Sequence, residues 1–243
     1  LVDWLRFLPA DVRGLAGKDL RVFWRDTTQW GQTLVLFGLL AAYIVNLRHF
    51  SRQFSNPFWI HLVSYLNLGA CALNLATLTT RFVFPQLSLE GKRMWIVGMA
   101  PLGLQRVLWT KFGMASAASL LVTLALMLLS CSMLQMPSLR TAYFAAAIAA
   151  MTFALNGLAV GLGAMYPNFR EDNPGKIVSG FGGTLCLVLS FVYILLSIVV
   201  LAAGTPWSWS STQPPDPARV LTCLLGLLIL TGLVGWLPLR FRF

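Results

Sequence analysis

Residues 177–203 read IVSGFGGTLCLVLSFVYILLSIVVLAA and contain no charged side chain. A transmembrane helix needs about 20 predominantly apolar residues, so this stretch is long enough to cross a bilayer. Five further stretches are similarly apolar and have no Asp, Glu, Lys or Arg well inside them: residues 30–47, 58–80, 112–134, 141–165 and 220–239. The sequence therefore predicts an all-α integral membrane protein with six transmembrane helices in a domain of residues 30–243.

The composition of the whole chain supports this fold class. Of its 243 residues, 57% are hydrophobic and only 11% are charged, and the mean hydropathy is +0.73. A soluble domain is about 45–50% apolar and about 25% charged, and a soluble fold of this length could not remove so much apolar surface from water. These values exclude a soluble enzyme, a secreted disulfide scaffold and a disordered tail. The four cysteines lie in apolar runs without CxxC spacing, so they are expected to be buried apolar residues.

The basic residues indicate how the helices are oriented. The chain has 18 Lys and Arg against 8 Asp and Glu, a net charge of +10. Most of the basic residues lie between the apolar runs, in alternate connecting segments, which favours membrane orientation over nucleic-acid binding. The positive-inside rule places these segments, and with them both termini, in the cytoplasm.

Residues 1–29 are predicted to form a cytoplasmic or interfacial amphipathic segment. Within 11–30, apolar side chains share one face of a helix, and Lys18, Arg21 and Arg25 lie nearly opposite. Such a helix lies in the plane of the lipid headgroups with its basic face toward phosphates. An ordinary cytoplasmic helix packed on protein is the alternative.

The loop between the second and third spans is too charged to cross a membrane and too apolar for a loose linker. Within the region 84–111, Ser88 is expected to cap a short helix, and Pro101 suits the first turn of another. This pattern predicts a helical docking surface on the cytoplasmic side; the alternative is a basic interfacial anchor. The first helix would carry Glu90, Lys92, Arg93 and Trp95, and the region is rich in the Arg, Trp and Met side chains that are common at interfaces.

Known catalytic and metal-binding motifs are absent from the sequence. There is no GxxxxGK[ST] phosphate loop, no HExxH and no GxSxG. Glu171 and Asp172 are adjacent carboxylates in a turn without a nearby His or Cys, so a metal site is not predicted there. We therefore expect no catalytic residues and no enzyme activity in this chain.

Three local strings resemble a known family. The first is Lys18-Asp-Leu-Arg-Val-Phe-Trp-Arg-Asp26, which leads toward the first span. The second is Arg81-Phe-Val-Phe-Pro-Gln-Leu-Ser-Leu-Glu-Gly91, followed by Trp95 and Ala100-Pro101, and the third is Tyr166-Pro-Asn-Phe169 with Glu171-Asp-Asn-Pro174. Together with six spans, they resemble type-2 ATP-binding-cassette export permeases of the bacterial branch called "putative ATP-binding-cassette exporters". Members of that branch are longer, so the chain is expected to be their C-terminal portion.

The resemblance implies a permease subunit that moves an unknown substrate across the bacterial inner membrane. It implies a cytoplasmic ATP-binding-cassette ATPase that holds and hydrolyses ATP with magnesium, no cofactor bound directly by this chain, a second six-span unit, and a lipid environment. The coupling helix would cover 88–97, and its candidate contacts would be Glu90, Lys92, Arg93 and Trp95. The second cytoplasmic contact would comprise Phe169, Arg170, Glu171 and Asp172. The alternatives are a membrane scaffold that does not transport, and a membrane enzyme whose active site lies outside this stretch.

Overall fold

The computed structural model describes residues 13–14, 17, 21, 31, 34–35, 37–42, 57–91, 103–171, 173–204 and 217–240. The described elements are all helical: α3 (Pro57–Leu78), the π-helix η2 (Thr79–Val83), α4 (Gln86–Glu90), α6 (Gly103–Met133), α7 (Ser138–Met165), α8 (Pro174–Ser179), α9 (Phe181–Gly204) and α10 (Pro217–Arg240). Within these ranges there is no strand. The described part of the chain is thus all-helical, in agreement with the α-class prediction.

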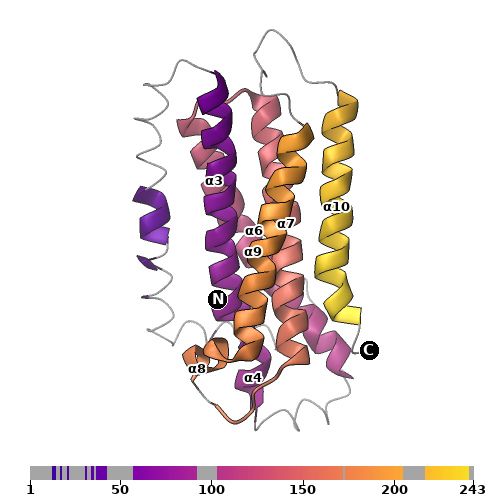
Figure 1. Cartoon of the computed structure of the whole chain (residues 1–243). Helices are drawn as coiled ribbons and strands as arrows, with labels where there is room; N and C mark the ends of the chain where they lie inside the picture. Colours follow the sequence, from indigo (N-terminus) through magenta and orange to yellow (C-terminus); the bar gives the residue numbers. More distant parts are fainter. Residues whose placement is uncertain are drawn as a thin grey trace.

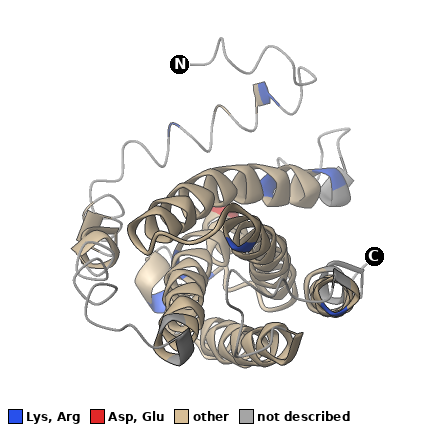
Figure 2. Ribbon diagram, turned by 90° about the horizontal axis from the view of Figure 1, so that it is seen from above, with Lys and Arg blue, Asp and Glu red and all other residues tan. Residues whose placement is uncertain are grey.

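The long helices stand side by side as a bundle, and the short helices α4 and α8 lie together at one end of it (Figure 1). We call this the α4 end. Seen along the bundle, α7 is enclosed by its neighbours, whereas α10 lies at the edge (Figure 2). Accordingly, 78% of the most apolar 18-residue stretch of α7 is buried, whereas only 11% of the corresponding stretch of α10 is buried.

Five helices are long and apolar enough to cross a membrane: His61–Glu90, Arg106–Met133, Ser138–Met165, Phe181–Gly204 and Ala218–Gly235. This gives the chain the character of a membrane protein. The predicted first span, 30–47, lies only partly within the described residues, so the sixth span remains a prediction. In the amphipathic segment Arg21 is helical and exposed, and Lys18 and Arg25 lie outside the described residues.

Two helix boundaries differ from the limits that hydropathy suggested. Helix α6 begins at Gly103 rather than at 112, and so includes Arg106 and Lys111. The apolar run 177–203 is divided at Gly180, whose backbone is extended between α8 and α9. At this break the backbone of Val178 lies against Gly183, where a Cβ atom would not fit.

Glycines allow close backbone contacts within the bundle. A Cβ added at Gly157 of α7 would lie 2.5 Å from the carbonyl oxygen of Gly235 on α10. Gly163 has the same relation to Phe84, since its Cβ would lie 2.5 Å from the carbonyl oxygen of Phe84. Small residues let helix backbones approach in this way within membranes.

The π-helix turns the chain from α3 into α4. The backbone N–H of Phe84 donates to the carbonyl of Thr79, at an N–O distance of 3.0 Å, which closes a five-residue step. The Phe84 ring is buried. Pro85 then stands at the N-cap of α4 without a side-chain hydrogen bond, so Ser88 is not the cap that the sequence suggested.

Candidate functional site

A buried ion pair ties α4 to α6. The Nζ atom of Lys111 lies 3.0 Å from Oε1 of Glu90, and the two side chains are only 4% and 10% exposed. Removing one partner from a buried pair leaves a charge without compensation, which is strongly unfavourable. The pair therefore fixes the C-terminal end of α4 against the first turns of α6.

The same short helix contacts the loop that follows α7. The buried hydroxyl of Ser88 accepts a hydrogen bond from the backbone N–H of Asn168, with an N–O distance of 3.1 Å. Gly91, which ends α4 at a φ of 21°, lies against Phe169: an added Cβ would be 3.8 Å from the Phe169 carbonyl oxygen. Two segments about 80 positions apart in the sequence thus form one contact.

Local hydrogen bonds shape the loop and the start of α8. The Asn168 side chain accepts from the backbone N–H of Arg170 at 3.1 Å, and Asn173 caps α8 by accepting from Gly175 N–H at 2.9 Å. Lys176 and Glu171 form a looser pair, 3.7 Å apart, with side chains 68% and 42% exposed. An exposed pair of this kind contributes little to stability.

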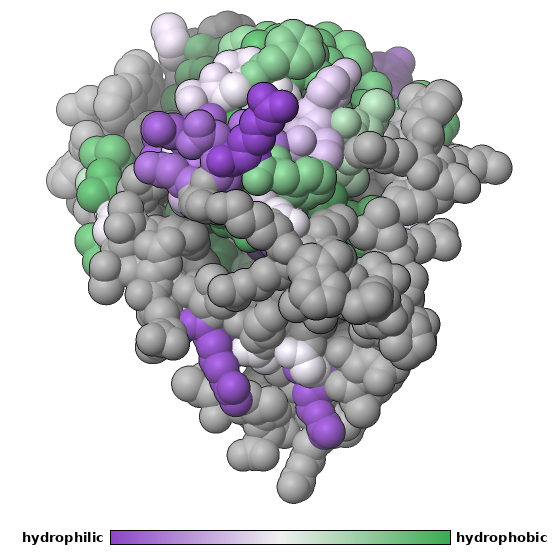
Figure 3. All heavy atoms as spheres, turned by 90° about the horizontal axis from the view of Figure 1, so that it is seen from below, coloured by the Kyte–Doolittle hydropathy of each residue, from purple (hydrophilic) through white to green (hydrophobic). Residues whose placement is uncertain are grey.

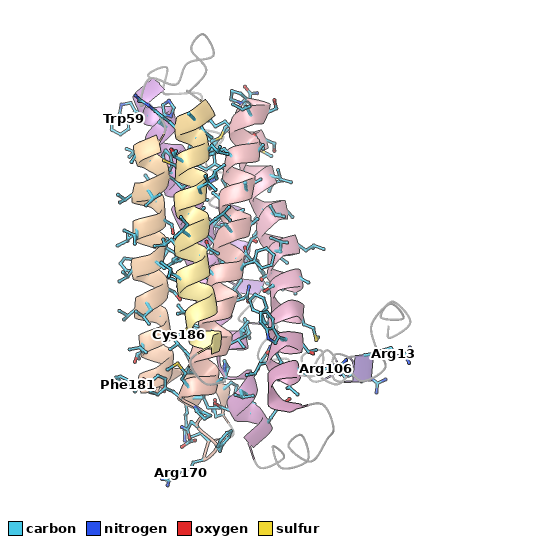
Figure 4. The ribbon with its side chains drawn as sticks, turned by 90° about the vertical axis from the view of Figure 1, so that its right-hand side faces the viewer. Arg13, Trp59, Arg106, Arg170, Phe181 and Cys186 are labelled. Carbon is cyan, nitrogen blue, oxygen red and sulfur yellow. The ribbon has the colours of Figure 1, made fainter. Side chains whose placement is uncertain are left out.

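Aromatic side chains border this loop on the bundle side. The rings of Tyr166 and Phe181 meet edge to face with centroids 5.7 Å apart, and both residues are exposed. Figure 4 shows Phe181 on the side of the bundle and Arg170 beyond the helix ends. Viewed from the α4 end, hydrophilic side chains gather beside apolar ones (Figure 3).

The structure brings together part of the predicted contact set. Glu90, Phe169, Arg170 and Glu171 all lie at the α4 end, Phe169 and Arg170 being exposed. Glu90 was expected to offer its charge to a partner, but in the chain it pairs with Lys111. The other predicted contacts lie outside the described residues: Lys92, Arg93, Trp95 and Asp172.

Ser88 and Lys111 are the contacts that sequence reasoning missed. Lys111 counted only as a basic residue before the third span, and Ser88 as a helix cap. The spacing between Lys111 and Glu90 gives no signal of their pairing, because residues 91–110 separate them. Among the described residues there is no group of three His, Cys, Asp or Glu that could hold a metal ion.

Replacing Ser88 with alanine should loosen the loop after α7. The partly buried N–H of Asn168 would lose its acceptor, at a cost of about 0.5–1.5 kcal/mol. We expect faster hydrogen exchange in the peptide that covers 166–171 and unchanged exchange in α9. Ser132→Ala is the matched control, because the Ser132 hydroxyl is exposed and donates only to the Leu129 carbonyl. Equal exchange in the two variants would contradict a structural role for Ser88.

Comparison with known proteins assigns a family to the chain. The family model described as "Putative ATP-binding cassette" matches residues 1–243. The chain belongs to this family. No curated protein matches it, and neither does any solved structure.

Membership in the ATP-binding-cassette family corrects two predictions. The description names an ATP-binding cassette, the ATPase type of domain, so the assignment of the chain as a permease subunit of an exporter is wrong. By the same finding, the expectation that the chain is no enzyme, with ATP hydrolysed only on a separate subunit, is also wrong. Because the sequence has no GxxxxGK[ST] loop, ATP binding by this chain would need other residues.

Proposed function

We propose that the chain is a membrane-embedded component of an ATP-binding-cassette system, and that its α4 end is the part that responds to ATP. The observation that carries this proposal is the buried Glu90–Lys111 pair, at an N–O distance of 3.0 Å. A buried ion pair is costly to break, so the two helices that it joins either move together or separate completely. This is the behaviour expected of an element that transmits a conformational change.

The contacts of α4 lead into most of the bundle. Helix α4 continues α3 through η2, is held to α6 by the ion pair, and meets the loop after α7 through Ser88. A displacement of α4 would therefore be passed to α3, α6 and α7 through direct contacts. Coupling between distant sites requires an element with two arrangements that both sites influence, and we assign that role to α4.

The partners of this assembly belong to the same proposal. We propose that the α4 end faces the cytoplasm of a bacterial inner membrane and contacts a cytoplasmic ATP-binding-cassette subunit, and that a second helical unit completes the complex. Exposed Leu89, Phe169 and Arg170 would form the described part of the contact. Glu171 would join them, and the contact residues outside the described part would be Lys92, Arg93, Trp95 and Asp172.

Adding ATP and magnesium should move α4 relative to the bundle. We would purify the protein with its associated subunits into nanodiscs, place spin labels at Leu89→Cys and Leu233→Cys, and measure their distance with and without nucleotide. Both positions are exposed, on α4 and α10. A change is expected for this pair, because α4 moves. None is expected for labels at Leu195 and Leu228, which are exposed in the middle of α9 and α10, outside the helices to which α4 would pass its movement.

A photoreactive ATP analogue shows in the same preparation where the nucleotide binds. Labelling of this chain would assign ATP binding to it, and labelling of a co-purified subunit would assign it to the complex. If no polypeptide is labelled and the Leu89–Leu233 distance does not change, the proposed function is wrong.

A further inference from the structure

The buried face of α6 contains a row of polar side chains. Ser116, Thr123 and Ser130 are all at least 97% buried, and they recur at the spacing of one helix face. Exposed Leu121 and Leu128 lie on the opposite, apolar side of the helix. Polar residues of membrane helices usually face the interior of the bundle, where they find partners.

These side chains meet polar residues of α7 in a seam, which we define as Ser116, Ser119, Thr123, Thr152 and Asn156. The Nδ2 atom of Asn156 donates to Ser119 Oγ at 2.7 Å and to the Thr152 carbonyl at 2.9 Å. One turn further along, the hydroxyl oxygens of Thr123 and Thr152 are 3.3 Å apart. The seam thus crosses the middle of two long apolar helices.

The donor hydrogens of the seam are nearly all engaged. The Ser119 hydroxyl donates to the Ala115 carbonyl at 2.6 Å, and the hydroxyls of Thr123 and Thr152 donate to the carbonyls of Ser119 and Ile148, both at 2.7 Å. The amide hydrogens of Asn156 are engaged as described above. What the seam has left is mainly acceptor capacity.

Two buried atoms of the seam lack a hydrogen bond within the described part of the chain. They are Oδ1 of Asn156, which can only accept, and Oγ of Ser116, which can donate or accept. Ser116 lies one turn before Ser119, whose hydroxyl is 3.4 Å from the Ser116 carbonyl oxygen. Leaving such atoms unsatisfied in an apolar interior is costly.

We propose that the α6–α7 seam binds an O–H group that donates to Asn156 Oδ1 and accepts from the Ser116 hydroxyl. Water has this chemistry, and so has the hydroxyl of a small amphiphilic alcohol. Buried waters typically make two to four hydrogen bonds to polar groups that would otherwise be unsatisfied. The site follows from the chemistry of the seam alone and does not depend on the response of α4 to ATP.

Cysteine reactivity tests the site in the full chain. In nanodisc-embedded protein, Ser116→Cys should react with methyl methanethiosulfonate about tenfold faster than Ile148→Cys, because a thiol in dry apolar surroundings ionises poorly and is inert. Ile148 is a matched control, since it is fully buried on α7. Peptide-resolved mass spectrometry separates residue 116 from the four native cysteines. Adding Asn156→Leu should lower the rate at Ser116→Cys to that of the control.

Equal reaction rates for Ser116→Cys and Ile148→Cys in folded protein would show that the seam holds neither water nor an alcohol, and would overturn the proposal. If Ser116→Cys does not fold, Ser119→Cys gives the same comparison, because its side chain contacts Asn156 directly. A competition experiment identifies the source of the O–H group. Protection of the cysteine by 1-octanol supports an alcohol in the site, and high reactivity without protection supports water.

Discussion

Replacing Glu90 with lysine is expected to detach α4 from α6 while leaving the protein in the membrane. The variant would place two ammonium groups where Glu90 and Lys111 now lie 3.0 Å apart with little exposure. Breaking a buried ion pair costs about 3–5 kcal/mol. A loss of that size corresponds to about 100-fold or more in the local opening equilibrium, since 1.4 kcal/mol is tenfold. Hydrogen exchange of the peptide covering 86–91 should rise accordingly, and the movement of α4 with ATP should be lost.

Charge reversal supplies the decisive control for this variant. Glu90→Lys combined with Lys111→Glu restores the pair with opposite polarity, and should recover most of the protection of α4. Glu171→Lys breaks the exposed Glu171–Lys176 pair instead, and is expected to cost at most about 1 kcal/mol. If Glu90→Lys and Glu171→Lys have equal effects on α4, the buried pair does not hold this helix.

The helical class of the fold was predictable because apolar runs determine it locally. Stretches such as 141–165 and 177–203 contain no charges and are longer than a bilayer requires. Their ends were harder to predict. Helix α6 extends back through Lys111 to Gly103 because Glu90 compensates the buried ammonium group. A hydropathy argument treats each charge alone, so it cannot foresee a pairing across a loop.

The candidate site was predictable only in outline. The family resemblance implied two separate cytoplasmic contacts, one at residues 88–97 and one at the loop that contains residues 169–172. Their direct contact through Ser88 and Asn168 depends on how η2 turns the chain beneath α7. That turn has no local sequence signature, because a π-helix differs from an α-helix by one residue in its hydrogen-bond step.

The α6–α7 seam shows the same limit in the interior. Asn156 lies within the predicted span 141–165, but its partner on α6, Ser119, is one of several serines and threonines on that helix. These residues occur widely in membrane helices, where they bond to their own backbone. Only the register of α6 against α7 reveals that one amide satisfies Ser119 and leaves an acceptor unsatisfied.

Placing valine at Gly157 is expected to separate α10 from α7. The added side chain would meet the Gly235 backbone, since the Cβ alone would lie 2.5 Å from its carbonyl oxygen and 2.8 Å from its Cα. Backbone cannot move aside as a flexible side chain can, so the two helices must part. Overpacking of this kind typically costs about 1–3 kcal/mol and occasionally more. We expect a lower melting temperature of the solubilised protein. We also expect that a cysteine introduced on α7 and one introduced on the facing side of α10, which crosslink in the native background, no longer do so.

Gly113→Val separates this steric effect from the general effect of a β-branched residue in a helix. Gly113 is exposed on α6, and a Cβ there would have nothing within 4 Å, so the melting temperature should stay close to that of the native protein. Helix propensity favours valine over glycine slightly at both positions, and therefore opposes the expected loss at Gly157. A stable Gly157→Val protein with its α7–α10 crosslink intact would mean that the two helices are not in backbone contact in the membrane. Since α7 is the helix around which the others pack, the positions of α6 and the seam would then need to be determined again.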